Sequence, residues 1–266
     1  MFSVNRSRII SLICVLLFVT YTAVTAQDST GIKENYAWAD STVINVQKNR
    51  LGYKKLIVPA VFIGYGVASL GVKDIKQLNF STKSEIDEHK PDHIKLDNYT
   101  QYMPALLVYG LNGIGIKGKH GFVDRSVIYA TSQLISAGFV VPLKRLIKEE
   151  RPDGSNKQSF PSGHTATAFS TAHFMFKEYK DEHFWLGLSG YSFAVFTGVY
   201  RTLNDKHWVG DVVAGAGIGI LSTELAYWLY PKMNNLFKRK KESSSTMVMP
   251  FYQNKSVGLS FVRNIP

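Results

Sequence analysis

Cysteine is almost missing from this sequence of 266 residues, and acidic residues are outnumbered by basic ones. The one cysteine, Cys14, lies in a segment that we expect to be removed on export. A mature chain without thiols excludes a disulfide scaffold, a cysteine nucleophile and a cysteine-ligated metal site. The 31 Lys and Arg against 20 Asp and Glu give a net charge of +11, which favours a negatively charged partner without choosing among nucleic acid, anionic lipid and phosphate.

The N-terminus has the pattern of a secretory signal peptide. Two arginines precede an apolar run over residues 9–19, and residues 24–26 (Val-Thr-Ala) supply the small side chains that a signal peptidase requires. We therefore expect residues 1–26 to be cleaved and the protein to be exported, which speaks against nucleic acid as the partner. An uncleaved membrane anchor fits less well, because the apolar run is short.

Long uninterrupted apolar runs are absent from the rest of the chain. Six moderately apolar segments occur instead, and they lack the two-residue alternation of strands, so they predict an all-α fold with a six-helix bundle core. These segments are Leu56–Val72, Tyr102–Ile116, Val127–Leu143, Thr165–Phe176, Trp185–Val199 and Val212–Leu229. A spanning helix needs about 20 predominantly apolar residues, and each segment is shorter or interrupted by Ser, Thr, Tyr or Pro. Hydropathy therefore leaves open whether the helices cross a membrane or pack a soluble core.

Composition divides the chain into four regions. They are the signal peptide (1–26), a polar N-terminal segment (27–55), the helical domain (56–237), and a basic run with a C-terminal β-hairpin (238–266). Two short strand-like runs, Thr246–Tyr252 and Val257–Val262, predict the hairpin. Within the helical domain, Lys73–Asn98 is charged and predicts a surface loop with one amphipathic turn.

Two basic residues form the first chemical motif. Lys144 and Arg151 are seven residues apart, nearly two helical turns, so both would lie on one face of a helix and could converge on one anion. Pro152 follows and would end that helix, which puts Arg151 at its end. Taken alone, such a pair more often complements the helix dipole.

The second motif is the tetrapeptide Pro161-Ser162-Gly163-His164. Ser162 precedes a run of good helix formers and is an N-cap signal, and the first N–H groups of a helix bind anions. Gly163 lets an anion approach the backbone, the Ser162 hydroxyl can donate, and His164 adds a titratable ring. An ordinary capped helix with an incidental histidine is a comparable alternative.

The third motif comprises Arg201, His207 and Asp211. A spacing of four residues at a helix start would stack His207 and Asp211 on one face. The carboxylate could then fix the tautomer of the imidazole and leave its other nitrogen available as a nucleophile or base. For this pair alone, a satisfied histidine beside a helix-start Asp would be the better interpretation.

The conjunction of the three motifs changes this balance. The patterns K-x6-RP, PSGH and R-x5-H-x3-D occur in this order, and they resemble the three-part signature of the type 2 phosphatidic acid phosphatase and vanadium haloperoxidase superfamily. The resemblance covers residues 100 to 230 approximately. It implies the helical bundle of that superfamily and an enzyme that hydrolyses phosphoric esters without a metal or other cofactor.

The resemblance also implies a role for each motif residue. His207 would attack phosphorus and form a phosphohistidine that water then hydrolyses. Asp211 would orient His207, and His164 would protonate the leaving oxygen. The remaining residues, Lys144, Arg151, Ser162, Gly163 and Arg201, would hold the phosphoryl oxygens.

The implied substrate is a phosphorylated lipid at the periplasmic face of the inner membrane. Candidates are phosphatidic acid, phosphatidylglycerol phosphate, undecaprenyl diphosphate and a phosphate of lipid A. A soluble periplasmic acid phosphatase of broad specificity is the alternative, favoured by a mean hydropathy of −0.05, and a vanadate-dependent haloperoxidase ranks below it. A topological conflict remains, because a cleaved signal and six full crossings would place the loops that carry the motifs in the cytoplasm. The sequence does not indicate an oligomeric state.

Overall fold

The protein is described here from a computed structural model that covers residues 51–89, 95–242, 246–253 and 256–263. The helices are α2 (Lys54–Gly71), α3 (Lys73–His89), α4 (Asp97–Thr100), α5 (Met103–Gly113), α6 (Phe122–Ile147), α7 (Gly163–Tyr179), α8 (Phe184–Leu203) and α9 (Val209–Glu242). Two strands, β1 (Thr246–Gln253) and β2 (Ser256–Arg263), pair antiparallel. The all-helical prediction for the body is confirmed, and the six predicted segments correspond to α2, α5, α6, α7, α8 and α9. The predicted signal peptide lies outside the described residues.

The predicted surface loop over Lys73–Asn98 is wrong. Residues 73–89 form α3, whose Ile86 is buried. Asn79 is buried as well, and its Oδ1 accepts a hydrogen bond of 3.2 Å from the backbone N–H of Gly210 at the start of α9. The contacts that hold α3 are few and partly polar, so an apolar pattern could not reveal this helix.

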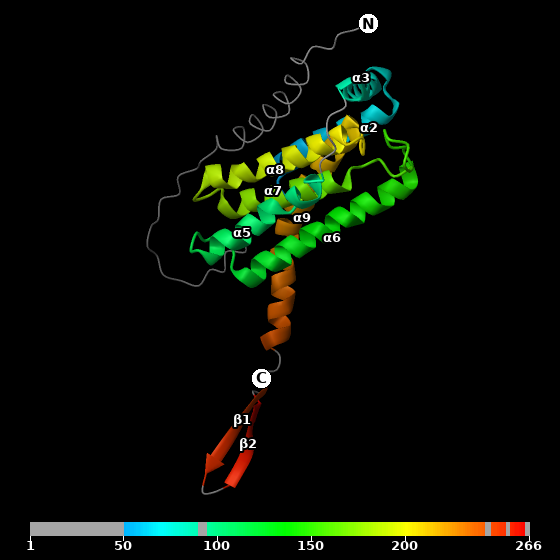
Figure 1. Cartoon of the computed structure of the whole chain (residues 1–266). Helices are drawn as coiled ribbons and strands as arrows, with labels where there is room; N and C mark the ends of the chain where they lie inside the picture. Colours follow the sequence, from blue (N-terminus) through cyan, green and yellow to red (C-terminus); the bar gives the residue numbers. More distant parts are fainter. Residues whose placement is uncertain (1–50, 90–94, 243–245, 254–255, 264–266) are drawn as a thin grey trace.

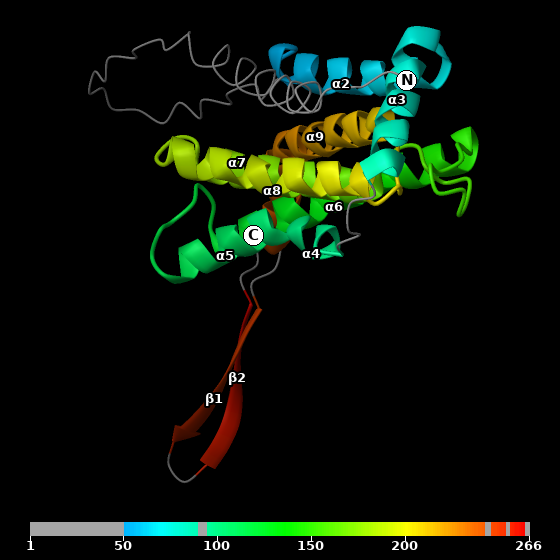
Figure 2. The same ribbon diagram turned by 45° about the horizontal axis from the view of Figure 1, so that its top comes forward.

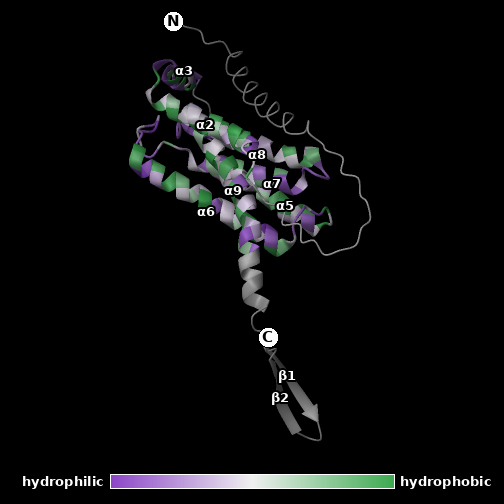
Figure 3. Ribbon diagram, turned by 180° about the vertical axis from the view of Figure 1, so that it is seen from behind, coloured by the Kyte–Doolittle hydropathy of each residue, from purple (hydrophilic) through white to green (hydrophobic). Residues whose placement is uncertain are grey.

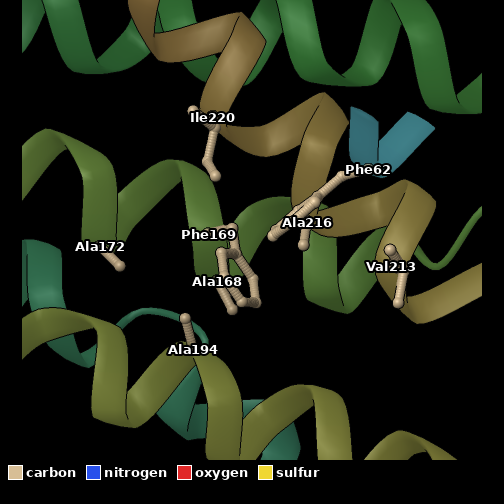
Figure 4. Packing of buried hydrophobic residues seen from close by; sticks show 8 residues of the cluster. All are labelled: Phe62, Ala168, Phe169, Ala172, Ala194, Val213, Ala216 and Ile220. Carbon is tan, nitrogen blue, oxygen red and sulfur yellow. The ribbon is translucent and has the colours of Figure 1, made fainter. Parts of the chain in front are cut away.

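The long helix α9 lies at the centre of the bundle. Helices α2, α6 and α7 pack along it, and α8 packs mainly on α7 (Figures 1 and 2). Phe62 of α2 and Phe169 of α7 meet Ile220 of α9 in the largest buried apolar cluster, which Figure 4 shows in close view. Each fully buried side chain of this size contributes about 1.5–3 kcal/mol to stability.

Glycines bring α7 and α9 unusually close together. A Cβ atom added to Gly219 would lie 2.3 Å from the backbone oxygen of Ala166, and one added to Gly215 would lie 2.5 Å from that of Ser162. Only glycine permits such an approach. The N-terminus of α7 is therefore held directly against the first turns of α9.

In the part of the chain that the structure describes, three helices are long and apolar enough to cross a membrane. They are α2, α6 and residues 209–234 of α9. Helix α9 is mostly buried, whereas α2 and α6 expose large apolar side chains such as Val61 and Leu134 to the outside. Figure 3 shows hydrophobic residues along both of these helices. Exposed apolar surface of this extent is typical of membrane contact, which supports a membrane protein.

Candidate active site

The three sequence motifs come together at one end of the bundle. The loop after α6, the start of α7 and the loop between α8 and α9 meet there (Figure 1). Backbone hydrogen bonds join these segments. Ser162 N donates to the carbonyl of Asp211 at 3.0 Å, and Asp153 N donates to that of Asp205 at 3.2 Å. These bonds hold the three segments that carry the motifs next to one another.

Two details of the predicted local structure are wrong, although the residues still meet. Helix α6 ends at Ile147, because Lys148 adopts a left-handed conformation with φ of 52°, so Arg151 lies in the following loop and not on the helix. His207 likewise precedes α9, which begins at Val209. The irregular loops, and not a shared helix face, bring each pair together.

His207 and Asp211 form the imidazole–carboxylate pair of the site. The His207 side chain is almost fully buried, and its Nδ1 lies 3.5 Å from Asp211 Oδ2. The same oxygen accepts hydrogen bonds from Ser159 Oγ and, at 2.9 Å, from Trp208 N. Burial lowers the pKa of His207 to about 4, although Asp211 opposes the shift. At neutral pH the imidazole is uncharged, so one ring nitrogen can offer a lone pair.

Three cations surround this pair. Electrostatic interactions link Lys144 to Arg151, Arg201 and Asp211. The Lys144 ammonium donates only to backbone carbonyls among its described contacts, those of Gln158 at 2.7 Å and Ser159 at 3.3 Å. Like charges this close repel one another unless an anion lies between them.

The two arginines have donor capacity to spare. Arg201 is buried, and its Nη1 donates to Asp97 Oδ2 at 2.8 Å. Among the described residues, neither Arg151 Nε nor Arg201 Nε has a hydrogen-bond partner, although both atoms are buried. Guanidinium groups bind phosphate through several parallel N–H bonds, so these donors fit a phosphoryl group.

Ser162 is the N-cap of α7, as predicted, and its Oγ accepts a hydrogen bond of 3.4 Å from Thr165 N. Its hydroxyl also pairs with Thr165 Oγ1 at 2.9 Å. A methyl group on Gly163 would meet no atom closer than 3.6 Å. Packing therefore does not require glycine here, and close approach of a ligand to the backbone is the better reason for it.

His164 lies beside the same cation cluster as His207. Its Nε2 lies 2.8 Å from Asn98 Oδ1, and burial followed by repulsion from Arg201 lowers its pKa to about 4. A chamber of about 470 Å³ opens beside it. Its lining residues are all polar or charged, although their apolar atoms supply most of the exposed lining. They are Lys95, Asp97, Asn98, Asp153, Arg201, Asn204, Asp205 and Lys206.

Residues 125–235 match the sequence profile of the PAP2 superfamily, and all eight predicted site residues lie within this range. These residues form a PAP2 superfamily domain. The domain therefore contains α6 to most of α9, whereas α2 to α5 precede it.

Two curated proteins are similar to this chain in sequence. A lipid A 1-phosphatase of Porphyromonas gingivalis is 33% identical over 187 residues, which are 70% of this chain and 40% of that protein. The bacitracin transport permease protein BcrC of Bacillus licheniformis is 39% identical over 77 residues, 29% of this chain and 36% of that protein. The chain thus spans less than half the length of either relative.

Two solved structures are similar to this chain in fold. A transmembrane PAP2-type phosphatidylglycerolphosphate phosphatase from Bacillus subtilis has a TM-score of 0.46 and 22% identity, covering 68% of this chain and 98% of that one. LpxE of Aquifex aeolicus has a TM-score of 0.43 and 21% identity, with coverages of 56% and 94%.

Four residues of the site were not predicted from the sequence. Asp97 and Asn98 of α4 contact Arg201 and His164 from outside the PAP2 domain. Ser159 contacts Asp211, and Glu149 lies beside the same carboxylate. No periodicity signals such contacts, because each depends on how distant segments pack.

Proposed function

We propose that this protein is a lipid phosphatase that acts through a phosphohistidine on His207. The observation that carries the proposal is the buried imidazole of His207 beside the cations Lys144, Arg151 and Arg201. The Nε atoms of both arginines are buried without a hydrogen-bond partner among the described residues. Such an arrangement stabilises the equatorial oxygens of a phosphoryl group during transfer.

The reaction has two steps. In the first, His207 Nε2 attacks phosphorus while its Nδ1–H faces Asp211, the P–O bond breaks, and His164 donates a proton to the leaving oxygen. In the second, His164 takes a proton from water, whose oxygen attacks phosphorus and breaks the P–N bond. Inorganic phosphate leaves, and His207 is again neutral. Covalent catalysis thus divides one difficult displacement into two.

His164 must gain a proton before the first step. Its pKa is low in the unliganded site because of burial and the neighbouring Arg201. A bound phosphate dianion reverses this electrostatic effect, since an opposite charge nearby favours the protonated imidazole. Substrate binding therefore supplies the condition for acid catalysis.

The substrate that the site fits best is a lipid whose phosphate is attached to a polar, sugar-like group. The residues that line the chamber beside His164 carry carboxylate, amide, ammonium and guanidinium groups, which can bind the hydroxyls of a headgroup. The apolar outer faces of α2 and α6 suit acyl chains or a bilayer. Lipid A 1-phosphate, the substrate named for the relative with 33% identity, is accordingly the first candidate.

The decisive experiment replaces His207 by Asn. We expect turnover of lipid A, phosphatidic acid and a soluble nitrophenyl phosphate to fall at least about a thousandfold, because nucleophile removal has effects of this order. His183→Asn is the matched control, since His183 is exposed at the far end of the bundle. Wild-type protein quenched with radiolabelled substrate should carry an acid-labile phosphate that His207→Asn lacks. Activity of the variant near the wild-type level would refute the assignment of His207.

We further propose that the site faces the periplasm, and cysteine labelling tests this orientation. In a Cys14→Ser background, Lys157→Cys places a thiol near the site and Glu182→Cys places one at the other end, both at exposed positions. A membrane-impermeant maleimide added to intact spheroplasts should label only the first. Labelling of Glu182→Cys alone would show that the site faces the cytoplasm. Release of the protein by osmotic shock would instead favour the soluble acid phosphatase.

A further inference from the structure

Two buried carboxyl oxygens beside the catalytic pair have no hydrogen-bond partner among the described residues. One is Asp211 Oδ1, and the other is Glu149 Oε2. The other oxygen of Asp211 is fully used, because Ser159 Oγ and Trp208 N donate to it and His207 faces it. A buried acceptor without a donor is destabilising, because it has lost its water without gaining a partner.

The backbone brings these two carboxyl groups together. Ser159 N donates to the carbonyl of Glu149 at 2.9 Å, while the Ser159 hydroxyl donates to Asp211. Glu149 and Asp211 are thus neighbours on either side of one serine, and their carboxyl groups interact electrostatically. A buried carboxylate beside another disfavours ionisation of both.

We propose that Glu149 is protonated and donates a hydrogen bond from Oε2 to Asp211 Oδ1. One proton satisfies both unpartnered oxygens. It holds the Asp211 carboxylate with Oδ2 directed at His207, which makes Glu149 a positioning residue for the nucleophile. The inference deepens the proposed function and rests on His207 as the attacking group.

The surroundings of Glu149 agree with a neutral carboxyl. Burial, followed by Asp211, raises the pKa of Glu149 to about 8, and Lys76 of α3 is the group that opposes this shift. The other charged groups around Asp211 are Lys144, Arg151 and Arg201, with His207 uncharged. The proton is therefore present at neutral pH and is lost as the pH rises through about 8.

Glutamine and alanine at position 149 separate the hydrogen bond from the charge. Glu149→Gln keeps a hydrogen-bond donor that cannot ionise. We therefore expect a kcat near that of wild type at pH 6.5, and no fall in kcat above pH 8 that arises from the side chain at position 149. Glu149→Ala removes the donor, and kcat should fall about tenfold with little change in KM, since Asp211 loses the hydrogen bond that fixes its orientation. Glu150→Gln makes the same side-chain substitution at the next, exposed residue and should keep the wild-type pH profile.

The wild type and Glu149→Gln share every other titrating group, so the difference between their pH profiles reports Glu149 alone. Identical alkaline limbs for kcat, or full activity of Glu149→Ala, would overturn the inference. Thermal unfolding supplies a readout that does not need turnover. The folded-state pKa of this acid lies above the unfolded one, so wild type should lose stability relative to Glu149→Gln as the pH rises from about 4.5 to about 8.

If no phosphate ester is turned over by wild type, the proposed function fails, whereas the unfolding comparison still decides whether Glu149 carries the proton. If the melting temperatures of wild type and Glu149→Gln then differ by the same amount at every pH, the inference is contradicted. If their difference widens toward pH 8, the protonated Glu149–Asp211 pair is supported without its catalytic role.

Discussion

The contact between α7 and α9 predicts an unusual outcome for a glycine-to-alanine change. In a helix interior this substitution normally stabilises by about 0.5–1 kcal/mol, because alanine has less backbone freedom to lose. At Gly219 the added Cβ would lie 2.3 Å from the carbonyl oxygen of Ala166 and 2.8 Å from Ser170 N. Both atoms belong to the backbone of α7, so no side-chain rotation relieves the clash.

The net effect follows from these two opposing contributions. Overpacking a tight interface costs about 1–3 kcal/mol, and a contact this short with a rigid backbone belongs at the upper end. We therefore expect Gly219→Ala to destabilise the protein by about 1–2 kcal/mol after the gain in helix propensity. Gly138→Ala on α6 is the matched control, because its Cβ would meet nothing within 4 Å and should stabilise.

Chemical unfolding of both variants in the same detergent measures this difference. The reasoning would be refuted if Gly219→Ala were as stable as Gly138→Ala. Gly215→Ala extends the test to activity, since its Cβ would press on the carbonyl of Ser162, the N-cap residue of the site. We expect this variant to lose kcat as well as stability, whereas Gly219→Ala, one turn further away, should mainly lose stability.

Three further predictions concern Asp97, the buried charge cluster around Glu224, and the effect of a chelator. Asp97→Ala removes the carboxylate that holds Arg201 and should lower kcat/KM about tenfold, whereas Asp97→Asn, which keeps an acceptor, should retain most activity; steady-state kinetics distinguishes them. Glu224→Gln leaves the buried His173 and Lys177 without their shared carboxylate and should destabilise by about 3 kcal/mol in an unfolding titration; unchanged stability would contradict the role of this buried charge cluster. Prolonged treatment with a chelator should leave phosphatase activity intact, since three fixed cations supply the positive charge; recovery of lost activity only on adding Mg²⁺ would count strongly against this.

The sequence predicted the helices that carry an apolar pattern and did not predict the one that lacks it. Segments such as Thr165–Phe176 and Val212–Leu229 have the length and composition of core helices, and they correspond to α7 and α9. Helix α3 was missed because its surface is mostly charged and its buried contacts include Asn79, a polar residue. Periodicity reports burial of apolar side chains, so a helix held partly by polar contacts escapes it.

The sequence predicted which residues would lie together where they belong to one motif. His207 and Asp211 do lie together, although His207 precedes the helix that was expected to hold both. Asp97 and Ser159 could not be predicted, because their partners lie 104 and 52 residues away. A spacing rule describes neighbours on one element, whereas these contacts depend on the packing of several.

The protonation of Glu149 also determines the charge that a substrate meets. With Glu149 neutral, the cations Lys144, Arg151 and Arg201 outnumber the carboxylates Asp97 and Asp211, while Asp153 beside Arg151 is paired with Lys206. The site is therefore positive and attracts a phosphate dianion. An ionised Glu149 would cancel the excess and add a negative group beside the nucleophile's partner. The affinity for phosphate and the fixed orientation of Asp211 toward His207 would then both be lost as the pH rises, because both depend on the same proton.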